Sequence, residues 1–443
     1  MSRSTNKLIL LSVAGLLAGA LAESAQAQIV VNGAGSSAGR QFAGGAPVAM
    51  CLNTPRPIHL RSGTNDTNSS RHTWICNVTG GGLTNQPSVI RYSASESGDG
   101  FTKVNSVGGL SKTAAYIRDL TDCPGVTPAP AQFPATGTPI LSWDEYSNCS
   151  GSGVETVDFG ASDVQASSFG QTGPTGNTFP DPSTAGLLPS DQIAVLPFSL
   201  FVNNGVRLQT ETGGLGGQLE NLNRAVVEAV FRRNPQDWTD LGYLVTSDGT
   251  TIDNTKSGIT LCLREAGSGT AAAFDQTMMI QSTVATVLSG AANGTGGSVI
   301  YSPTSTGVVT CVQNNVNGIG YLNAESVVPN AHPIKFNGYS ANYTAAEVAG
   351  NTSPIARKRD VACGRYESWT TWVINRKTSY NPANKGNLIQ AFIDAARTET
   401  NNVPSGSHWV ALSEMNVNKA VDAGPIGFNG TFGVVPSNPE CRP

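Results

Sequence analysis

Short runs of apolar, β-branched residues recur along the chain, and each run stops at a cluster of glycine, serine and other small polar residues. The four clearest cases are "IVVNGAG" from Ile29, "SVIRYSASESGDGF" from Ser88, "ETVDFGASD" from Glu155 and "ITLCLREAGSGTAAAF" from Ile259. A β-branched run that ends at glycine is typical of a strand that leads into a loop. The pattern therefore predicts four strands, each followed by a small polar loop.

Apolar residues spaced three and four positions apart indicate helices between these strands. The stripe is Leu219, Leu222, Val226 and Val230 in "QLENLNRAVVEAVFRR", and Leu388, Ile389, Phe392, Ile393 and Ala396 in "GNLIQAFIDAARTE". A third helix is predicted where "AAAFDQTMMIQ" follows the turn after Arg264. Strands that alternate with helices predict α/β layers with largely parallel sheets, whose ligands lie at the carboxyl ends of the strands. The four loops fall at those ends.

The turn between Arg264 and the third helix has the chemistry of an anion site. A Gly-Ser-Gly-Thr segment that opens a helix brings together free backbone N–H groups, the hydroxyls of Ser268 and Thr270, and the positive end of the helix dipole. The alternative is that Ser268 or Thr270 only caps the helix.

The N-terminal segment predicts export. Arg3 and Lys7 precede an apolar run that ends in small residues at Ala25-Gln26-Ala27, which is the layout of a signal peptide over residues 1–27. The mature chain is expected to begin at Gln28 as a soluble periplasmic or secreted protein. Eight cysteines fit an oxidising compartment and predict disulfides; sequence leaves their pairing open, and pairing of neighbours in order is the simplest arrangement.

Composition excludes several classes of function. Only 13% of residues are charged and the net charge is −4, so there is no basic stripe for nucleic acid and no charged run for a membrane surface. No Cys-x-x-Cys pair occurs, and the four histidines lack metal-ligand spacing, so no metal or other cofactor is expected. Polar stretches at 52–88, 121–153 and 170–186 are interpreted as loop insertions tied by disulfides.

Taken in order, the loops "VNGAGSS", "YSASESGDG", "VDFGASD" and "REAGSGT" resemble those of the periplasmic phosphate-binding proteins that serve ABC transporters, a branch of the type 2 solute-binding proteins. Weaker echoes follow in "LPFSLFVNN", "GIGYLNAES" and "WTTWVINRK". The resemblance implies a two-lobed type 2 periplasmic-binding-protein fold, with a ligand cleft between the lobes. Residues 28–196 and 366–443 would form one lobe and residues 197–365 the other, and the lobes would close around the ligand.

The resemblance also implies a set of ligand-binding residues and no catalytic or metal site. These residues are Ser37, Ala38, Ser97, Asp163, Arg264, Ser268, Gly269 and Thr270. An arginine fork, hydroxyls and helix N-terminal amides all suit an oxyanion. Asp163 suits only a ligand that carries a proton, as phosphate does at neutral pH and sulfate does not. The alternative for Asp163 is an Asx turn at the end of a strand.

The chain departs from the family in three places. Glu96 and Asp99 add negative charge to the second loop, and a carboxylate about 4 Å from a bound anion would oppose it by about 4 kcal/mol. Ala38 replaces an aromatic residue, although Arg40 follows closely and could restore positive potential. Ala266 replaces an acid that orients the arginine, and the adjacent Glu265 would point elsewhere.

The resulting prediction is an exported monomer that binds phosphate or a related protonated oxyanion, with an ABC transporter membrane component as partner. Two alternatives stay open. "GSSAG" matches a hydrolase nucleophile elbow at Ser37, although no histidine stands in a partner motif and we expect no enzyme. The other is a binding-protein fold with a different ligand, or with an adhesive, matrix or scavenging role outside transport.

Overall fold

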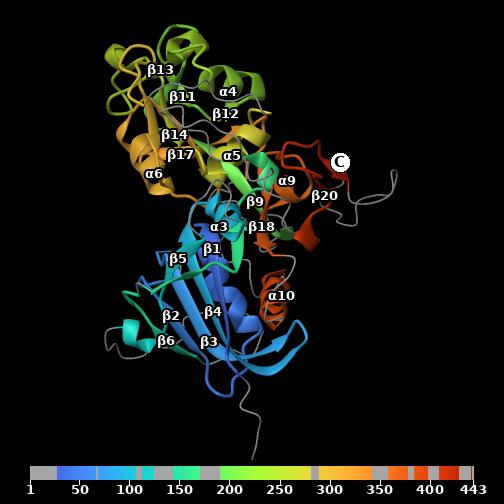
Figure 1. The fold of residues 1–443 in the computed structure, drawn as a ribbon. Coiled ribbons are helices and arrows are strands. Elements are labelled where there is room, and N and C mark those ends of the chain that lie inside the picture. Colours follow the sequence, from blue (N-terminus) through green and yellow to red (C-terminus); the bar gives the residue numbers. More distant parts are fainter. Residues whose placement is uncertain are drawn as a thin grey trace, which may run out of the picture.

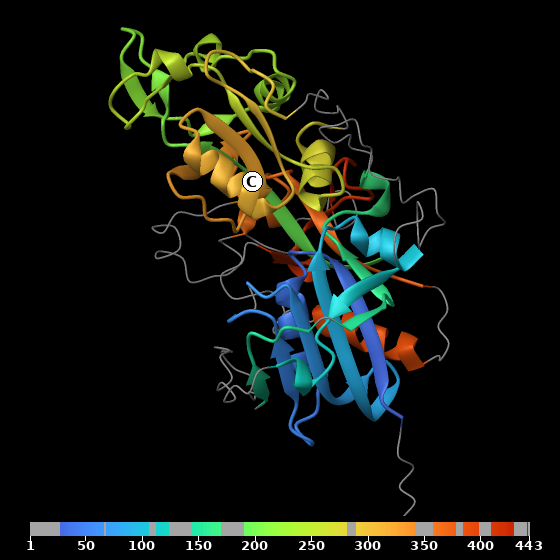
Figure 2. The same cartoon turned by 60° about the vertical axis from the view of Figure 1, so that its left-hand side comes forward.

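A computed structural model describes residues 27–65, 68–105, 112–123, 143–151, 153–169, 190–280, 289–341, 358–377, 384–397, 409–428 and 441. Residues 1–26 of the predicted signal peptide, the segment 170–186 and His408 lie outside these residues. The chain forms two lobes, one above the other in Figures 1 and 2. Among the described residues, no helix is both long and apolar enough to cross a membrane.

The first lobe is built on a mixed sheet in the order β6-β2-β3-β4-β1-β8-β18. Its strands are β1 (Ile29–Ser36), β2 (Ile58–Arg61), β3 (Arg71–Gly80), β4 (Leu83–Ser95), β6 (Asp144–Tyr146), β8 (Phe159–Ser162) and β18 (Trp369–Arg376). A separate pair is β5 (Thr113–Tyr116) with β7 (Gly153–Thr156), and the helices are α2 (Arg40–Gly45), α3 (Asp99–Asn105) and α10 (Asn384–Arg397). Helix α10 packs Leu388, Phe392 and Ile393 into the same core as Val31 and Phe159 of the sheet.

The second lobe continues the same sheet in the order β15-β14-β16-β9. Its strands are β9 (Ser190–Asn203), β12 (Asn221–Leu222), β14 (Thr260–Arg264), β15 (Val299–Ser302), β16 (Gly318–Asn323) and β17 (Ala331–Phe336), with a small sheet of β10 (Val206–Gln209), β11 (Leu215–Gln218) and β13 (Tyr243–Val245). Its helices are α4 (Arg224–Phe231), α5 (Gly269–Thr277), α6 (Ser305–Asn314) and α9 (Arg359–Ala362). Near the C-terminus lie β19 (Val410–Ala411), β20 (Val417–Asn418) and β21 (Gly427–Phe428).

Two adjacent antiparallel strands carry the chain between the lobes. Strand β9 pairs with β18 through Pro197 and with β16 from Phe198 onward, so it belongs to both halves of the sheet. Strand β18 returns the chain and inserts between β9 and β8. The long green strand in Figure 2 is β9, which runs from one lobe into the other. Lobe boundaries at residues 196/197 and 365/366 remain a prediction.

The α/β fold and the four strand-to-loop motifs are confirmed, but the expectation of largely parallel sheets is wrong, because the large sheet is mixed: β2–β3 and β3–β4 are antiparallel, whereas β2–β6 at its edge is parallel. Strand β1 runs parallel to β4 and β8, and β14 runs parallel to β15 and β16. The joining strands β9 and β18 pair antiparallel with each other and with β16 and β8. Antiparallel pairing follows because the chain leaves and re-enters the first lobe through neighbouring strands.

Two smaller expectations are also corrected. The helix predicted from Leu219 begins only at Arg224, because the side chain of Asn223 caps it by accepting from the Val226 amide over 3.0 Å. The segment 52–88 is not a loop insertion but contains β2, β3 and the start of β4, with the hairpin turned at Gly81 and Gly82, where φ is +57° and +87°. Glycine adopts these left-handed angles without strain.

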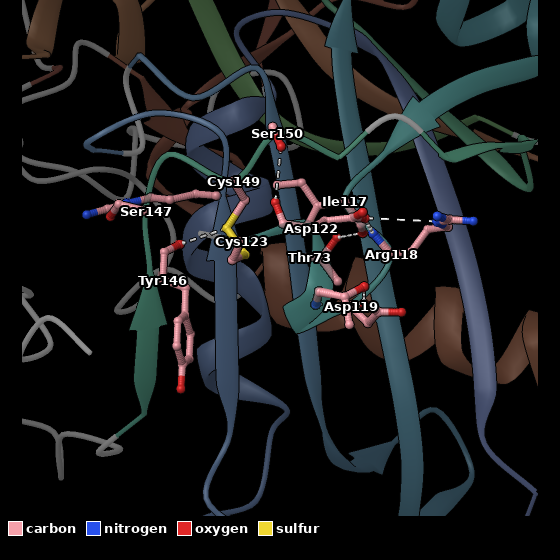
Figure 3. The surroundings of a disulfide bond; sticks show 12 residues. Thr73, Ile117, Arg118, Asp119, Asp122, Cys123, Tyr146, Ser147, Cys149 and Ser150 are labelled. Carbon is pink, nitrogen blue, oxygen red and sulfur yellow. Dashed lines mark hydrogen bonds and ion pairs between the residues drawn. A yellow bond between two sulfur atoms is a disulfide. The ribbon is translucent and has the colours of Figure 1, made fainter. Parts of the chain in front are cut away.

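Neighbouring cysteines pair in order, as the simplest arrangement predicted. The four disulfides are Cys51–Cys76, Cys123–Cys149, Cys262–Cys311 and Cys363–Cys441. Figure 3 shows Cys123–Cys149 beside a short network in which Thr73 donates to the Ile117 carbonyl over 2.6 Å. This bridge joins the segment before β6 to the segment just after it, where the Cys149 amide donates to the Arg61 carbonyl of β2 over 3.0 Å. The described part of 121–153 is thus tied by a disulfide, as predicted.

Candidate functional site

The predicted loops meet at the junction of the two lobes, where α3 of the first lobe faces α5 of the second (Figure 1). The Gly98 amide donates to the Gly267 carbonyl over 3.0 Å, which joins the loop before α3 to the loop before α5. Gly269 lies so close to the first lobe that an added Cβ would be 2.3 Å from Ser97 Oγ and 2.9 Å from Asp163 Cβ. Only glycine fits there, so the glycine of "GSGT" permits this close approach.

Asp163 is at the centre of this junction and is only 4% exposed. Its main chain is held on both sides, since its amide donates to Ser97 Oγ over 3.3 Å and its carbonyl accepts from Thr370 Oγ1 over 2.5 Å. Its carboxylate Oδ1 accepts a short hydrogen bond from the Ser36 hydroxyl. Burial raises the pKa of Asp163 above its usual value, while hydrogen bonds from Ser36 and Ser97 and the charge of Arg264 lower it.

The first loop contributes Ser36 rather than the predicted Ser37 to this contact. Ser36 ends β1 and is fully buried, whereas Ser37 and Ala38 are half-buried. The Ala38 amide, a candidate donor to a ligand, donates to Ser36 Oγ over 3.1 Å instead. No hydrogen bond joins the Ser37 hydroxyl to a histidine among the described residues, so the arrangement expected of a nucleophile elbow is absent there.

Arg264 ends β14 and is 7% exposed. Nη1 donates to Ser305 Oγ over 2.9 Å and Nη2 to the Pro303 carbonyl over 3.0 Å, while Nε has no hydrogen-bond partner within the described residues. Arg264 forms no ion pair with any described carboxylate. Burial lowers its pKa, and the Tyr321 phenol and the Glu96 and Asp163 carboxylates oppose that shift. An arginine remains charged at neutral pH even so.

Ser268 and Thr270 flank the first turn of α5. Ser268 is the N-cap, and its Oγ accepts from the Ala271 amide over 3.3 Å, so the capping interpretation of this serine is confirmed. A hydroxyl that accepts in a cap can still donate its own hydrogen to a ligand. Thr270 Oγ1 donates to Asn323 Oδ1 over 3.4 Å. Both side chains are buried, at 2% and 3% exposure.

The two extra acids of the second loop have different surroundings. Asp99 forms an ion pair with Lys103 of α3 over 2.9 Å, which compensates its charge. Glu96 has no such partner within the described residues; burial raises its pKa, and the charge of Arg264 opposes the shift. Burial lowers the pKa of Arg40, which faces Tyr92 and Glu325.

Ser36 and Glu325 lie within the quoted stretches "VNGAGSS" and "GIGYLNAES" but were not among the predicted site residues. Glu325 follows β16, and its Oε1 accepts from Asn323 Nδ2 and Trp409 Nε1, each over 3.4 Å. Burial raises the pKa of Glu325, and the negative charge of Asp163 adds to the rise. The "SS" pair after "GAG" was a signal for Ser36, but sequence alone could not say which of two adjacent serines turns inward. Among the described residues, no cluster of three or more metal-ligating side chains occurs.

Comparison with known proteins gives matches among solved structures only. No family model matches the chain, and no curated protein matches it. A putative phosphate ABC transporter substrate-binding protein from Clostridium perfringens, solved with phosphate, is 15% identical, with 86% of this chain and 99% of that chain covered and a TM-score of 0.43. A phosphate-binding protein from Stenotrophomonas maltophilia is 11% identical, with 87% and 91% covered and a TM-score of 0.43.

A third structure, an ABC-type phosphate transport receptor from Vibrio cholerae, is 14% identical, with 54% of this chain and 74% of that chain covered and a TM-score of 0.34. By their names, the three structures belong to the class whose loop motifs this sequence resembles. Because the identities and TM-scores are low, the function is inferred from the residues of this chain.

Proposed function

We propose that this protein binds phosphate or a related oxyanion that carries a proton, at the junction of its lobes. The observation that carries the proposal is Arg264, a buried cation that no carboxylate of the described residues pairs. An unpaired buried charge costs several kcal/mol, and about 3 to 5 kcal/mol is typical when a partner is removed. A bound anion would supply the missing negative charge and accept from the free Nε–H.

The groups around Arg264 support an oxyanion in particular. Ser97, Ser268 and Thr270 bring hydroxyls to the same junction without adding charge. The first turn of α5 adds backbone N–H groups that have no partner within the helix. A fork-shaped cation with several neutral donors is the usual protein partner of a tetrahedral oxyanion.

Asp163 supports a ligand that carries a proton. A carboxylate that faces an oxyanion is tolerated only where the ligand donates a hydrogen between the two oxygens. Monohydrogen phosphate and arsenate have such a hydrogen at neutral pH, and sulfate does not. Phosphate is therefore expected to bind far more tightly than sulfate.

We further propose that the protein is exported by the predicted signal peptide, acts as a monomer outside the cytoplasm, and delivers its ligand to an ABC transporter membrane component. This part rests on the resemblance of the loop motifs. A role outside transport would use the same ligand site without the membrane partner. Among the residues that the structure describes, we assign no arrangement at the site to catalysis.

The test is calorimetric titration of mature protein with phosphate, arsenate and sulfate, together with Arg264→Ala. The variant should lose at least about 2 kcal/mol of phosphate binding free energy, because the ligand charge is left without its buried partner. Arg56→Ala is the matched control: Arg56 pairs with Asp144 over 3.0 Å on the surface of the first lobe, and its loss should leave affinity unchanged. Absence of binding by any of the three anions at millimolar concentration would refute the proposal.

A further inference from the structure

The Ser36 hydroxyl has all of its hydrogen-bonding capacity committed. A serine hydroxyl has one hydrogen to donate and two lone pairs that accept. Ser36 Oγ accepts from the Ala38 amide over 3.1 Å and from the Gly39 amide over 3.3 Å; the Gly39 amide also bonds the Ser36 carbonyl over 3.1 Å. With both lone pairs occupied, the hydroxyl hydrogen is left for Asp163 Oδ1.

The main chain of Ser36 is fixed as well, so this donor cannot turn away. The Tyr92 hydroxyl donates to the Ser36 carbonyl over 2.7 Å, and Ser36 is fully buried. Strand β1 pairs with β4 as far as Ser36 and Ser95. The backbone just before it is equally confined, because an added Cβ on Gly35 would lie 2.1 Å from the Ala161 carbonyl oxygen.

A fixed donor on Oδ1 determines how Asp163 can be protonated. A proton on Oδ1 would oppose the Ser36 hydrogen, so Oδ1 stays an acceptor and only Oδ2 can carry a proton. We propose that Ser36 is the positioning residue that fixes Asp163 as a hydrogen-bond acceptor and thereby makes the site select oxyanions that bear a proton. The role of Ser36 rests on the proposed function and names a determinant of its specificity.

Other charged groups near Asp163 cannot replace this contact. Arg264 lies across the lobe junction and lowers the pKa of Asp163, but it forms no ion pair with the carboxylate. Tyr92 on β4 and Glu325 after β16 also face Asp163, and a negative charge on either would raise that pKa. Thr370 on β18 bonds only the Asp163 carbonyl. Ser36 and Ser97 are the neutral donors that counter burial.

The variant Ser36→Ala tests the proposal, with Ser95→Ala as matched control. Ser95 ends the neighbouring strand, and its buried hydroxyl has no partner among the described residues, so its removal should not affect Asp163. Ser36→Thr keeps the hydroxyl and should behave as wild type. Circular dichroism and a melting curve establish that each variant is folded.

The first readout needs no ligand. Carbon-13 NMR titration of the side-chain carboxyls, with the Asp163 signal assigned from Asp163→Asn, should give a midpoint about one pH unit or more higher in Ser36→Ala than in wild type, since a donor to the charged form is lost. Ser95→Ala and Ser36→Thr should keep the wild-type midpoint. An unchanged midpoint in folded Ser36→Ala would overturn the proposal.

The second readout is competition of phosphate with sulfate between pH 5 and pH 8. In Ser36→Ala, Asp163 should protonate at higher pH and then donate to sulfate, so the preference for phosphate should fall about tenfold at pH 5 and less at pH 8. A preference equal to wild type at every pH would limit Ser36 to capping the turn. If wild type binds neither anion, the proposed function fails, and the NMR titration still decides the role of Ser36.

Discussion

Glu96 illustrates how single residues of the second loop set the strength of the site. Glu96 and Asp99 share one loop, yet only Asp99 has a described ion-pair partner, in Lys103. Burial raises the pKa of Glu96, and the charge of Arg264 opposes that rise. An ionised Glu96 therefore competes with a bound anion for Arg264, whereas the charge of Asp99 is already compensated by Lys103.

We predict that Glu96→Gln strengthens phosphate binding at neutral pH by about 1 kcal/mol or more, because a charge that repels the ligand is removed at nearly constant shape. Asp99→Asn should change affinity little, since Lys103 already compensates Asp99. Calorimetry of both variants at fixed salt measures the difference. Equal effects of the two substitutions would mean that Glu96 does not face the ligand.

At this scale the motifs identified the loop that holds each candidate residue but not always the side chain. Asp163, Arg264 and the "GSGT" residues come together as the order of the loops implied. Ser36 and Ser37 could not be separated by sequence, because the direction of a serine at a strand end depends on the last turn of the backbone. Glu325 lies in "GIGYLNAES", a weak echo that assigned it no role, so its place near Asp163 could be seen only in the tertiary fold.

At the scale of elements, β2 and β3 bury a pair of histidines, His59 and His72, whose spacing in the sequence did not indicate a metal site. His59 on β2 and His72 on β3 are neighbours across the two strands, with His59 Nε2 3.1 Å from His72 Nδ1. The two residues are 0% and 1% exposed. Burial lowers the pKa of His72 well below its usual value, and the nearby His59 and Arg61 lower it further. His72 is therefore neutral in the folded protein at neutral pH.

We predict that stability falls as pH drops below about 6.5, the usual pKa of an unfolded histidine. Below that pH, His72 binds a proton in the unfolded chain but not in the folded protein. The free energy of unfolding therefore decreases by up to about 1.4 kcal/mol per pH unit for this group. Above that pH the contribution is fully present. Urea unfolding at pH 7.5, 6.5, 6.0 and 5.5 measures the slope.

The variant His72→Asn serves as the comparison for this titration. It should be less stable at pH 7.5, since it loses buried packing and the contact with His59, but its stability should depend less on pH between 6.5 and 5.5. A wild-type slope in His72→Asn would assign the acid sensitivity to other groups.

The elements also show where local patterns were sufficient and where they were not. The helix predicted over the stripe at Leu388 forms as α10, because its apolar face packs on β1 and β3. The helix predicted over the stripe at Leu219 begins five residues later, at Arg224, although Asn223 is an ordinary N-cap signal. The hairpin of β3 and β4 was missed because polar residues between glycines suggested a loop. Its alternation is clear only once Gly80 to Gly82 are recognised as a turn.

At the scale of the molecule, the two lobes touch through the loops that hold the candidate ligand residues. The Gly98–Gly267 hydrogen bond and the fit of Gly269 against Ser97 describe a closed junction. Entry of a ligand between these loops requires the lobes to separate. The joining strands β9 and β18 are the elements about which they would turn.

We predict that phosphate shifts the protein in solution towards this closed arrangement. The radius of gyration measured by small-angle X-ray scattering should decrease when phosphate is added to protein freed of anions, because the ligand contacts both lobes. Arg264→Ala should show no such decrease at the same phosphate concentration. If calorimetry shows that phosphate binds but the radius of gyration of the wild type does not change, the lobes are closed with and without the ligand.

The insertion of β18 between β9 and β8 has a consequence for the order in which the molecule can be completed. The ribosome makes β8 and β9 long before β18, so the first lobe remains unfinished, with two bare strand edges, until residue 376 has been made. Bare edges invite pairing with other chains, so this interval is the period of greatest aggregation risk. Three of the four disulfides have no such delay, because Cys51–Cys76, Cys123–Cys149 and Cys262–Cys311 all precede β18, whereas Cys363–Cys441 can close only after it.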